Sequence, residues 1–214
     1  MTPQPPLVLI VDDDARVREG LRELLEAHGL RVAAYASAGA YARAAPPEGP
    51  ACLLLDVELP DINGLDLQSQ LAGAGHPPIV FITGHGDIPS SVRAIKHGAV
   101  DFLTKPFGED ALMAAIGAAL AQDQSARAER ADLEGLRARY EGLTRRERDV
   151  LPLIVSGMLN KQSAAELGLS EVTLQVHRRN VLRKMGADSL ADLVRVAERL
   201  RIPITHSRRG EREA

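Results

Sequence analysis

The stretch Leu53-Leu54-Leu55-Asp56-Val57-Glu58-Leu59-Pro60 decides the fold of this chain. It begins as an apolar run of strand length, which is typical of a strand buried on both faces of a parallel sheet between layers of helices. The run ends on the carboxylate of Asp56, at the strand end where the functional groups of open parallel sheets collect. Because turns also favour aspartate, this stretch alone leaves open whether Asp56 is a functional residue or a turn residue.

Strand and helix patterns alternate five times in the first half of the chain. Short apolar runs predict strands at residues 7–11 and 31–35, up to Asp56, and at 79–82 and 100–104. Apolar residues at helical spacing predict helices at residues 15–28, 37–45 and 88–97, after Gly64, and from about Glu109. This alternation is typical of an α/β fold, a doubly wound five-stranded parallel sheet with helices on both faces.

Polar side chains follow four of these strands: Asp12, Asp13 and Asp14 after the first, Asp56 after the third, Thr83 after the fourth and Lys105 after the fifth. Clustered carboxylates repel one another unless a cation is present. A few oxygen ligands suit Mg²⁺, which often bridges a carboxylate and a phosphate. A hydroxyl and an ammonium at the same edge can hold two phosphoryl oxygens, so this set predicts phosphoryl transfer onto an aspartate.

The segments VDDD, LLLDVELPDINGLD, FITGHGD and DFLTKPF occur in an order and spacing that resemble the receiver domain of two-component response regulators. The resemblance covers about residues 5–120 and implies a flavodoxin-like domain in which Asp56 accepts a phosphoryl group from a sensor histidine kinase. It implies a Mg²⁺ site made by Asp13 and Asp56, with help from Asp12 and the backbone carbonyl of Glu58. It also implies a switch hydroxyl at Thr83, a switch aromatic ring at Phe102 and a phosphate-binding ammonium at Lys105.

Two further expectations concern residues beside this set. Asp14 lies outside the acidic pair of the family, so we expect it to cap the following helix. The Lys105–Pro106 bond resembles one that the family holds in the cis form, which X–Pro bonds can adopt.

The charge of the chain is divided between its two halves. Residues 1–120 carry 8 basic and 15 acidic residues, whereas residues 121–214 carry 18 basic and 14 acidic ones. A basic second half is a candidate for binding nucleic acid. The single Cys52 lies in an apolar strand, which fits a reducing compartment. No apolar run approaches the roughly 20 residues that span a bilayer, so we expect a cytoplasmic protein without membrane contact.

The segment between the halves predicts a helical linker at residues 121–139. Large apolar side chains are absent from residues 121–132, which indicates a solvated or frayed helix without a core. Leu133, Leu136, Tyr140 and Leu143 then return at near-heptad spacing, as a short coiled-coil seam or as a helix docked on the second domain. We expect a receiver domain at residues 5–120, a DNA-binding domain at 140–203 and a disordered tail at 204–214.

Capping residues divide the second domain into four short helices, a small all-α unit containing a helix-turn-helix. Thr144 and Glu147 form a capping box for the first, and Asn160, Ser170 and Ser189 are the expected caps of the others. In the helix after Ser170, we expect one buried face and one exposed face. The buried face contains Leu174, His177 (hydrogen-bonded), Val181 and Met185, and the exposed face contains Val172, Gln175, Val176, Arg179 and Arg183.

The segments LTRRERDVLPLIVSG and NKQSAAELGLSEVTLQVHRRNVLRKM resemble the LuxR-type helix-turn-helix of NarL/FixJ regulators, and GHGD makes the FixJ-like subgroup the most similar. The resemblance covers about residues 140–203. It implies base contacts by Gln175, Val176 and Arg179, and phosphate contacts by Lys161, Arg178, Arg183 and Lys184. Three residues depart from the pattern: Pro152 inside a helix, which removes a hydrogen bond or kinks it, Ser163 in place of an apolar residue, and Val172 in place of a basic one.

These observations predict a regulator of transcription that acts through phosphorylation and not as an enzyme, apart from the phosphorylation and dephosphorylation of its own receiver. Phosphorylation of Asp56 is expected to pair two receivers, with Lys96 and Asp101 as candidate contacts, and to present two helix-turn-helix domains to a two-fold site on double-stranded DNA. RNA polymerase is a further candidate partner. The alternatives are a regulator that binds DNA without phosphorylation and a Mg²⁺-dependent phosphotransferase with an aspartate nucleophile.

Overall fold

The computed structural model describes residues 5–73, 75–84 and 88–203. The described residues divide into two compact units, one up to Ala128 and one from Glu129. The expected tail at 204–214 lies outside the described residues. No helix in the described part of the chain is both long and apolar enough to cross a membrane.

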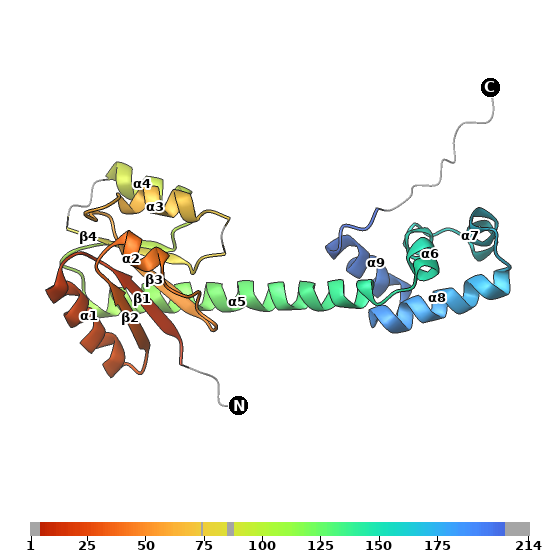
Figure 1. Ribbon diagram of the computed structural model, residues 1–214, viewed down its shortest axis with the longest axis horizontal. Helices are drawn as coiled ribbons and strands as arrows, with labels where there is room; N and C mark the ends of the chain where they lie inside the picture. Colours follow the sequence, from red (N-terminus) through yellow and green to blue (C-terminus); the bar gives the residue numbers. More distant parts are fainter. Residues whose placement is uncertain (1–4, 74, 85–87, 204–214) are drawn as a thin grey trace, which may run out of the picture. The chain divides into compact units, whose positions relative to one another are not determined.

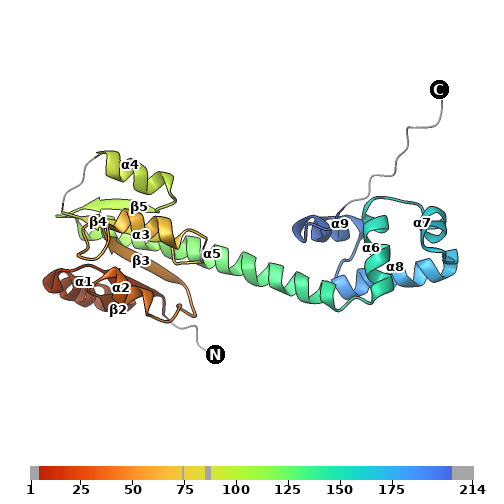
Figure 2. The ribbon, with the colours of Figure 1, turned by 45° about the horizontal axis from the view of Figure 1, so that its top comes forward.

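The first unit contains the predicted five-stranded parallel sheet, in the order β2-β1-β3-β4-β5 (Figures 1 and 2). The strands are β1 (Leu7–Val11), β2 (Arg31–Tyr35), β3 (Ala51–Asp56), β4 (Ile79–Thr83) and β5 (Asp101–Thr104). All six residues of β3 are buried, because this strand is central and covered on both faces. The register pairs Val11 with Leu55 and Asp56 with Ile82, so the carboxyl ends of neighbouring strands meet at one edge.

Alternate residues of the strands pack against two different helical layers. Val8, Ile10 and Leu54 face α1 (Ala15–Ala27) and the start of α5 (Glu109–Glu141). Leu9 and Leu53 face the opposite layer, formed by α2 (Ala38–Ala42), α3 (Gly64–Leu71) and α4 (Ile88–Lys96). Figure 2 shows α4 on the β5 side of the sheet. This alternation is the period of two that a pleated strand imposes.

The helix boundaries largely follow the predicted ones. Asp14 caps α1 by accepting a hydrogen bond from the Arg16 amide at 2.8 Å, as expected. Helix α2 is shorter than the helix expected at 37–45. It spans only five residues after its cap, Ser37. The Lys105–Pro106 bond is cis, which confirms that expectation.

Helix α5 runs unbroken over 33 residues and includes the segment that was expected to lack a core (Figure 1). That expectation was wrong in one place, because Asp123 is only 2% exposed. Its Oδ2 accepts hydrogen bonds from the Ala51 amide at 2.8 Å and from Arg127 Nε at 2.6 Å. A second nitrogen of the same guanidinium donates to the carbonyl of Pro47. These polar contacts anchor residues 123–127 to the start of β3, although the segment has no large apolar side chain.

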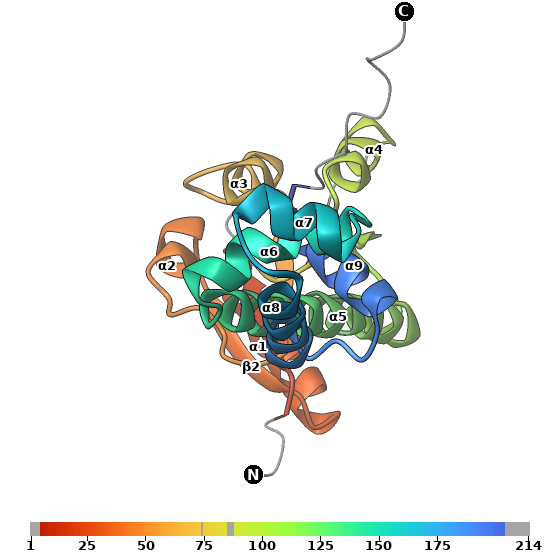
Figure 3. The same cartoon turned by 90° about the vertical axis from the view of Figure 1, so that its right-hand side faces the viewer.

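The second unit contains the end of α5 and four further helices, α6 (Arg145–Val155), α7 (Asn160–Leu167), α8 (Glu171–Met185) and α9 (Leu190–Arg199). Figure 3 views α8 nearly along its axis, with α6, α7 and α9 around it. The core of this unit includes Val150, Leu151, Ile154, Leu174 and Val181. Tyr140 and Leu143 pack into that core, so their spacing reflects docking on this unit.

Two details of the second unit concern the atypical residues Pro152 and Ser163, and two others, at Asn160 and His177, contradict the expectations. Helix α6 continues through Pro152, whose carbonyl accepts a hydrogen bond from the Ser156 hydroxyl at 2.6 Å. Ser163 is buried. Asn160 is not a cap, because α7 begins at this residue and Leu159 precedes it as the N-cap. His177 is half-buried, and its Nδ1 has no hydrogen-bond partner among the described residues, contrary to the expected bonded histidine.

Candidate functional site

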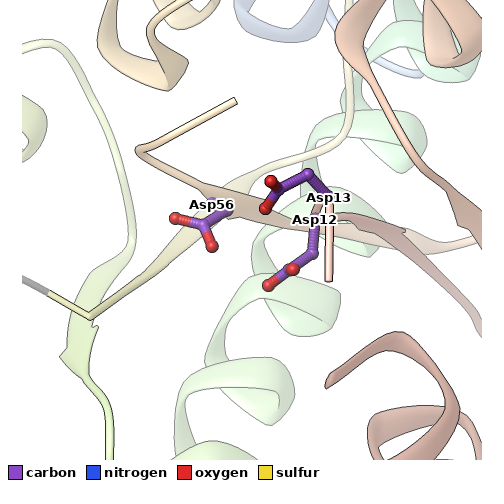
Figure 4. Close-up of side chains that lie close together, drawn as sticks. All are labelled: Asp12, Asp13 and Asp56. Carbon is purple, nitrogen blue, oxygen red and sulfur yellow. The ribbon is translucent and has the colours of Figure 1, made fainter. Parts of the chain in front are cut away.

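Three carboxylates gather at the carboxyl edge of the sheet in the first unit (Figure 4). Asp12 and Asp13 follow β1, and Asp56 ends β3, which is hydrogen-bonded to β1. One oxygen from each of the three lies within 4.8 Å of the others. Asp12 and Asp56 are buried, whereas Asp13 is exposed to solvent. The strand pairing therefore brings together residues that are more than forty positions apart in sequence.

Lys105 lies between the two buried carboxylates. Its Nζ is 2.7 Å from Asp12 Oδ2 and 2.8 Å from Asp56 Oδ2. Burial alone lowers the pKa of Lys105, but the hydrogen bonds and charges of these two aspartates outweigh it, so the net pKa is raised. Burial raises the pKa of Asp12, and hydrogen bonds from Lys105 and the Asp14 amide only partly offset this rise. Lys105 is therefore held in its charged form, and negative charge at Asp12 remains costly.

A second cation holds the backbone of the same edge. Arg18 of α1 donates from Nη1 to the carbonyl oxygens of Asp12 at 2.7 Å and Asp13 at 2.8 Å. Two cations beside three carboxylates still leave an excess of negative charge. Hard oxygen donors with excess negative charge, one of them open to solvent, fit a divalent cation such as Mg²⁺. Asp12, Asp13 and Asp56 are the side chains that could hold it.

The main chain after β3 positions Asp56. The Glu58 amide donates to Asp56 Oδ1 at 3.0 Å, so the backbone of Glu58 lies beside the cluster while its side chain is exposed. The Gly64 amide donates to the Val57 carbonyl at 2.8 Å. A Cβ at position 64 would collide with the carbonyl oxygen of Asp56, so only glycine fits there. The roles of Gly64 and Arg18 were not predicted, although the Asn63-Gly64 pair is a turn signal in the sequence.

Thr83 and Phe102 lie on the two neighbouring strands. Thr83 ends β4 and is fully buried. Its carbonyl accepts a hydrogen bond from the Lys105 amide at 2.7 Å, which ties the end of β4 to the residue that binds the carboxylates. Phe102 of β5 is half-buried, with its ring centroid 6.0 Å from that of Phe81.

Helix α4 exposes an apolar row beside these strands. Ile88, Val92 and Ile95 are 80%, 45% and 48% exposed and recur at the i, i+4, i+7 spacing of one helix face. Lys96, at the end of the helix, is also exposed, and Asp101 in β5 is half-buried. The sequence pointed to Lys96 and Asp101 but not to the apolar row, because an amphipathic pattern does not distinguish a buried face from an uncovered one.

Helix α8 in the second unit has the two faces that the sequence predicts. Leu174, Val181 and Met185 are at most 1% exposed and form its inner face. Its outer face is exposed and carries Gln175, Val176, Arg179 and Arg183. Lys161, on α7, is exposed as well. A surface that combines arginine, an amide and small apolar groups is suited to contact with base edges and phosphates.

Two residues expected to contact phosphates are bonded within the unit instead of lying free on this face. Arg178 donates to Asn160 Oδ1 at 3.2 Å, and Lys184 Nζ lies 2.7 Å from Oε2 of the buried Glu147. Burial raises the pKa of Glu147, but hydrogen bonds from Lys184 and Thr144 outweigh this effect and lower it overall. Glu147 also accepts from the Thr144 amide at 2.8 Å, which completes the predicted capping box.

Comparison with known families identifies both units. The response regulator receiver domain family matches residues 8–117. The luxR family of bacterial regulatory proteins matches residues 141–197.

Relatives match over nearly the whole chain. Nodulation protein W of Bradyrhizobium diazoefficiens is 46% identical over 202 residues, which cover 94% of this chain and 89% of that protein. The transcriptional regulatory protein FixJ of Azorhizobium caulinodans is 44% identical over 91% of this chain and 93% of its own length. The solved structure of the response regulator StyR is 46% identical, covers 91% of this chain and 98% of its own, and aligns with a TM-score of 0.80.

Proposed function

Because the chain belongs to the response-regulator family, as a receiver joined to a luxR-type DNA-binding domain, we propose that phosphorylation of Asp56 controls its binding to promoter DNA. The family places it among the DNA-binding regulators of transcription. A receiver domain implies a sensor kinase as its partner. The phosphoacceptor, the dimer and the two-fold promoter site are the parts of the proposal that go beyond family membership.

The observation that carries the proposal is the position of Lys105 between Asp12 and Asp56. An ammonium at 2.8 Å from the Asp56 carboxylate marks the place where extra negative charge on that residue would be stabilised. In this proposal, a carboxylate oxygen of Asp56 attacks the phosphorus of a phosphohistidine. The new O–P bond forms as the P–N bond breaks and the kinase histidine leaves. A Mg²⁺ held by Asp12, Asp13 and Asp56, with the Glu58 carbonyl, would neutralise charge on the phosphoryl oxygens.

The proposed signal passes from the phosphoryl group to the α4–β5 surface. A phosphoryl oxygen draws the Thr83 hydroxyl toward Asp56, and the Phe102 ring moves inward with it. The exposed row of Ile88, Val92 and Ile95 supports a role for this surface in pairing, since apolar side chains gathered on one face commonly mark an interface. In a two-fold dimer, Lys96 of one copy would meet Asp101 of the other.

The proposed DNA interface is the outer face of α8. Gln175, Val176 and Arg179 read base edges in the major groove, and Lys161 and Arg183 contact phosphates. Arg178 and Lys184 are less favoured as phosphate contacts, because each is half-buried and bonded inside the unit. Arg183 is exposed, and its bond to Asn180 Oδ1 is longer, at 3.4 Å. Paired receivers would bring two such helices to a two-fold site.

Acetyl phosphate with Mg²⁺ provides the test, with Asp56→Asn as the control. Wild-type protein should incorporate phosphate, double its mass by light scattering and bind a promoter-derived duplex more tightly. Asp56→Asn should do none of these. A wild-type protein that takes up phosphate without a change in mass or in DNA retention would contradict the proposed coupling, and equal phosphate uptake by Asp56→Asn would contradict the phosphoacceptor.

The two alternatives receive less support. A regulator independent of phosphorylation does not need the Lys105 contacts or the acidic cluster. A phosphotransferase with an aspartate nucleophile would need a general acid two residues later, where the Glu58 side chain is exposed. Steady hydrolysis of a generic phosphate ester by the wild-type protein would favour the enzyme instead.

A further inference from the structure

One residue on the outer face of α8 is unusual for a surface that binds a polyanion. Val172 is 73% exposed, and Val176, one turn later, is 54% exposed. An exposed valine adds nothing to the attraction of phosphates, and it leaves apolar surface in water unless a partner covers it. Val172 is therefore expected to contact an apolar group of the partner when the helix is bound.

The helix geometry places Val172 at the centre of the outer face. At about 100° per residue, Arg179 and Arg183 lie within about 20° of Val172 around the helix axis, and Val176 lies within about 40°. The buried Val181 is about 180° away, so Val172 points directly away from the core. Glu171, the acidic residue of the first turn, lies about 100° to one side.

Val172 also lies at the end of α8 that enters a groove first. Ser170 caps the helix by accepting from the Thr173 amide, so Val172 is the second residue of the first turn. In helix-turn-helix proteins, the first residues of the recognition helix contact base edges. Among the groups that bases expose on the major-groove edge, the apolar one is the 5-methyl group of thymine.

We infer that Val172 is a specificity-determining residue that packs against the 5-methyl group of a thymine in each half of the DNA site. The inference rests on the proposed reading of DNA by α8 and adds a fourth base-reading side chain to it. Loss of one methyl contact removes about one buried methyl group, which corresponds to a three- to five-fold change in affinity, on the order of 0.8 kcal/mol.

The test uses the whole 214-residue chain treated with acetyl phosphate and Mg²⁺, and a duplex enriched by that protein from a random DNA pool. Each thymine of the enriched duplex is replaced in turn by deoxyuridine, which removes only the 5-methyl group. A single replacement in one half-site should weaken wild-type binding about three- to five-fold, and the equivalent replacement in both half-sites should weaken it about ten- to twenty-five-fold. Val172→Ala, which removes the contact in both half-sites, should bind the unmodified duplex about ten- to twenty-five-fold more weakly and should not distinguish thymine from uracil at that position.

Val176→Ala is the matched control, because it shortens the neighbouring exposed valine on the same face. Because Val176 is itself one of the proposed base-reading residues, this variant should also weaken binding of the unmodified duplex, but it should keep the uracil penalty at the Val172 position. Since both side chains are exposed, neither substitution should change the helical content measured by circular dichroism. Val172→Thr, which keeps the shape of the side chain, provides a second variant and should retain part of the discrimination.

Three outcomes would overturn the inference and leave the DNA-reading role of α8 intact. These are wild-type binding that no uracil replacement weakens, a uracil penalty that persists in Val172→Ala, and a Val172→Ala defect that is equal on enriched and random duplexes. In the last case, Val172 would contact the sugar-phosphate backbone. If wild-type protein enriches no duplex under any condition, the proposed reading of DNA falls together with the inference.

Discussion

Each unit of the protein contains a lysine paired with buried carboxylate, and the two arrangements differ in their balance of charge. Lys105 in the first unit is shared by Asp12 and Asp56, and the exposed Asp13 adds a third carboxylate. Lys184 in the second unit pairs with one carboxylate, Glu147, which the backbone amide of Thr144 also satisfies. The pKa of Asp12 is raised, chiefly by burial, whereas the pKa of Glu147 is lowered because its hydrogen bonds outweigh burial.

The difference separates a site from a structural contact. Around Glu147, one carboxylate is matched by one ammonium, and its Oε2 also accepts a hydrogen bond from the Thr144 amide, so the contact stabilises the fold. Around Asp56, the acids outnumber the cations, one acid faces solvent, and the arrangement can accept a cation and then a phosphoryl group. Four experiments test this contrast.

The largest expected effect is on phosphate uptake. Asp56→Asn should abolish incorporation from acetyl phosphate, because an amide oxygen is a far weaker nucleophile than a carboxylate. Glu147→Gln should leave incorporation within about two-fold of wild type, because Glu147 lies in the second unit and does not contact the groups that take part in phosphoryl transfer. Intact-protein mass spectrometry measures both variants. Uptake lost in Glu147→Gln would mean that the two lysine contacts are not independent.

The next effect is on the stability of the second unit. Glu147→Ala should lower its free energy of unfolding by about 2–3 kcal/mol, because it leaves the half-buried Lys184 and the Thr144 amide without their acceptor. Asp149→Ala removes a half-buried carboxylate of the same helix that has only a 3.9 Å contact with Arg146, and it should change this free energy by less than about 0.5 kcal/mol. Urea unfolding followed by hydrogen exchange resolves the two units. Equal effects of the two substitutions would remove the structural role assigned to Glu147.

The pH dependence of that contact follows from the direction of its pKa shift. The pKa of Glu147 is lower in the folded state than its ordinary value of 4.5. Its stabilising effect is therefore fully present above the ordinary value and is lost as the pH falls through the lowered one. The difference in unfolding free energy between wild type and Glu147→Gln, about 1–2 kcal/mol near neutral pH, should shrink below about pH 4.5. A difference that stays constant down to the lowered pKa and below would show that charge does not contribute.

The smallest expected effect is that of Mg²⁺ on the first unit. An ion that binds only the folded cluster should stabilise that unit by about 1.4 kcal/mol at roughly ten times its dissociation constant. The second unit should not respond, and neither should the first unit of Asp13→Asn, which lacks the exposed carboxylate. Thermal unfolding in EDTA and in Mg²⁺ measures the shift. A similar shift in both units would indicate a general salt effect.

The sequence predicted both folds and the residues of the acidic cluster because their signals are local. Apolar runs of strand length, helix caps and a carboxylate at a strand end are each visible within a few residues, and the parallel sheet brings the strand ends together. Both faces of α8 followed from its helical period, with Leu174 buried and Arg179 exposed. The same reasoning failed for Asn160, because helix α7 begins one residue earlier than expected. It also failed for His177, whose Nδ1 has no hydrogen-bond partner among the described residues.

Long-range pairing decided the rest, because the partner of a polar side chain cannot be read from the residues beside it. Asp123 was expected in a solvated helix, yet it is buried against the Ala51 amide. The contact of Lys184 with Glu147, 37 positions earlier, was not predicted either. The clash that a side chain at Gly64 would make with Asp56 is likewise a tertiary contact. The sequence by itself determined where the strands, helices and candidate phosphoacceptor lie, since periodicity and caps are local. Only the tertiary structure decided which charges are matched within the protein and which remain for a partner, since that depends on distances between residues far apart in the chain.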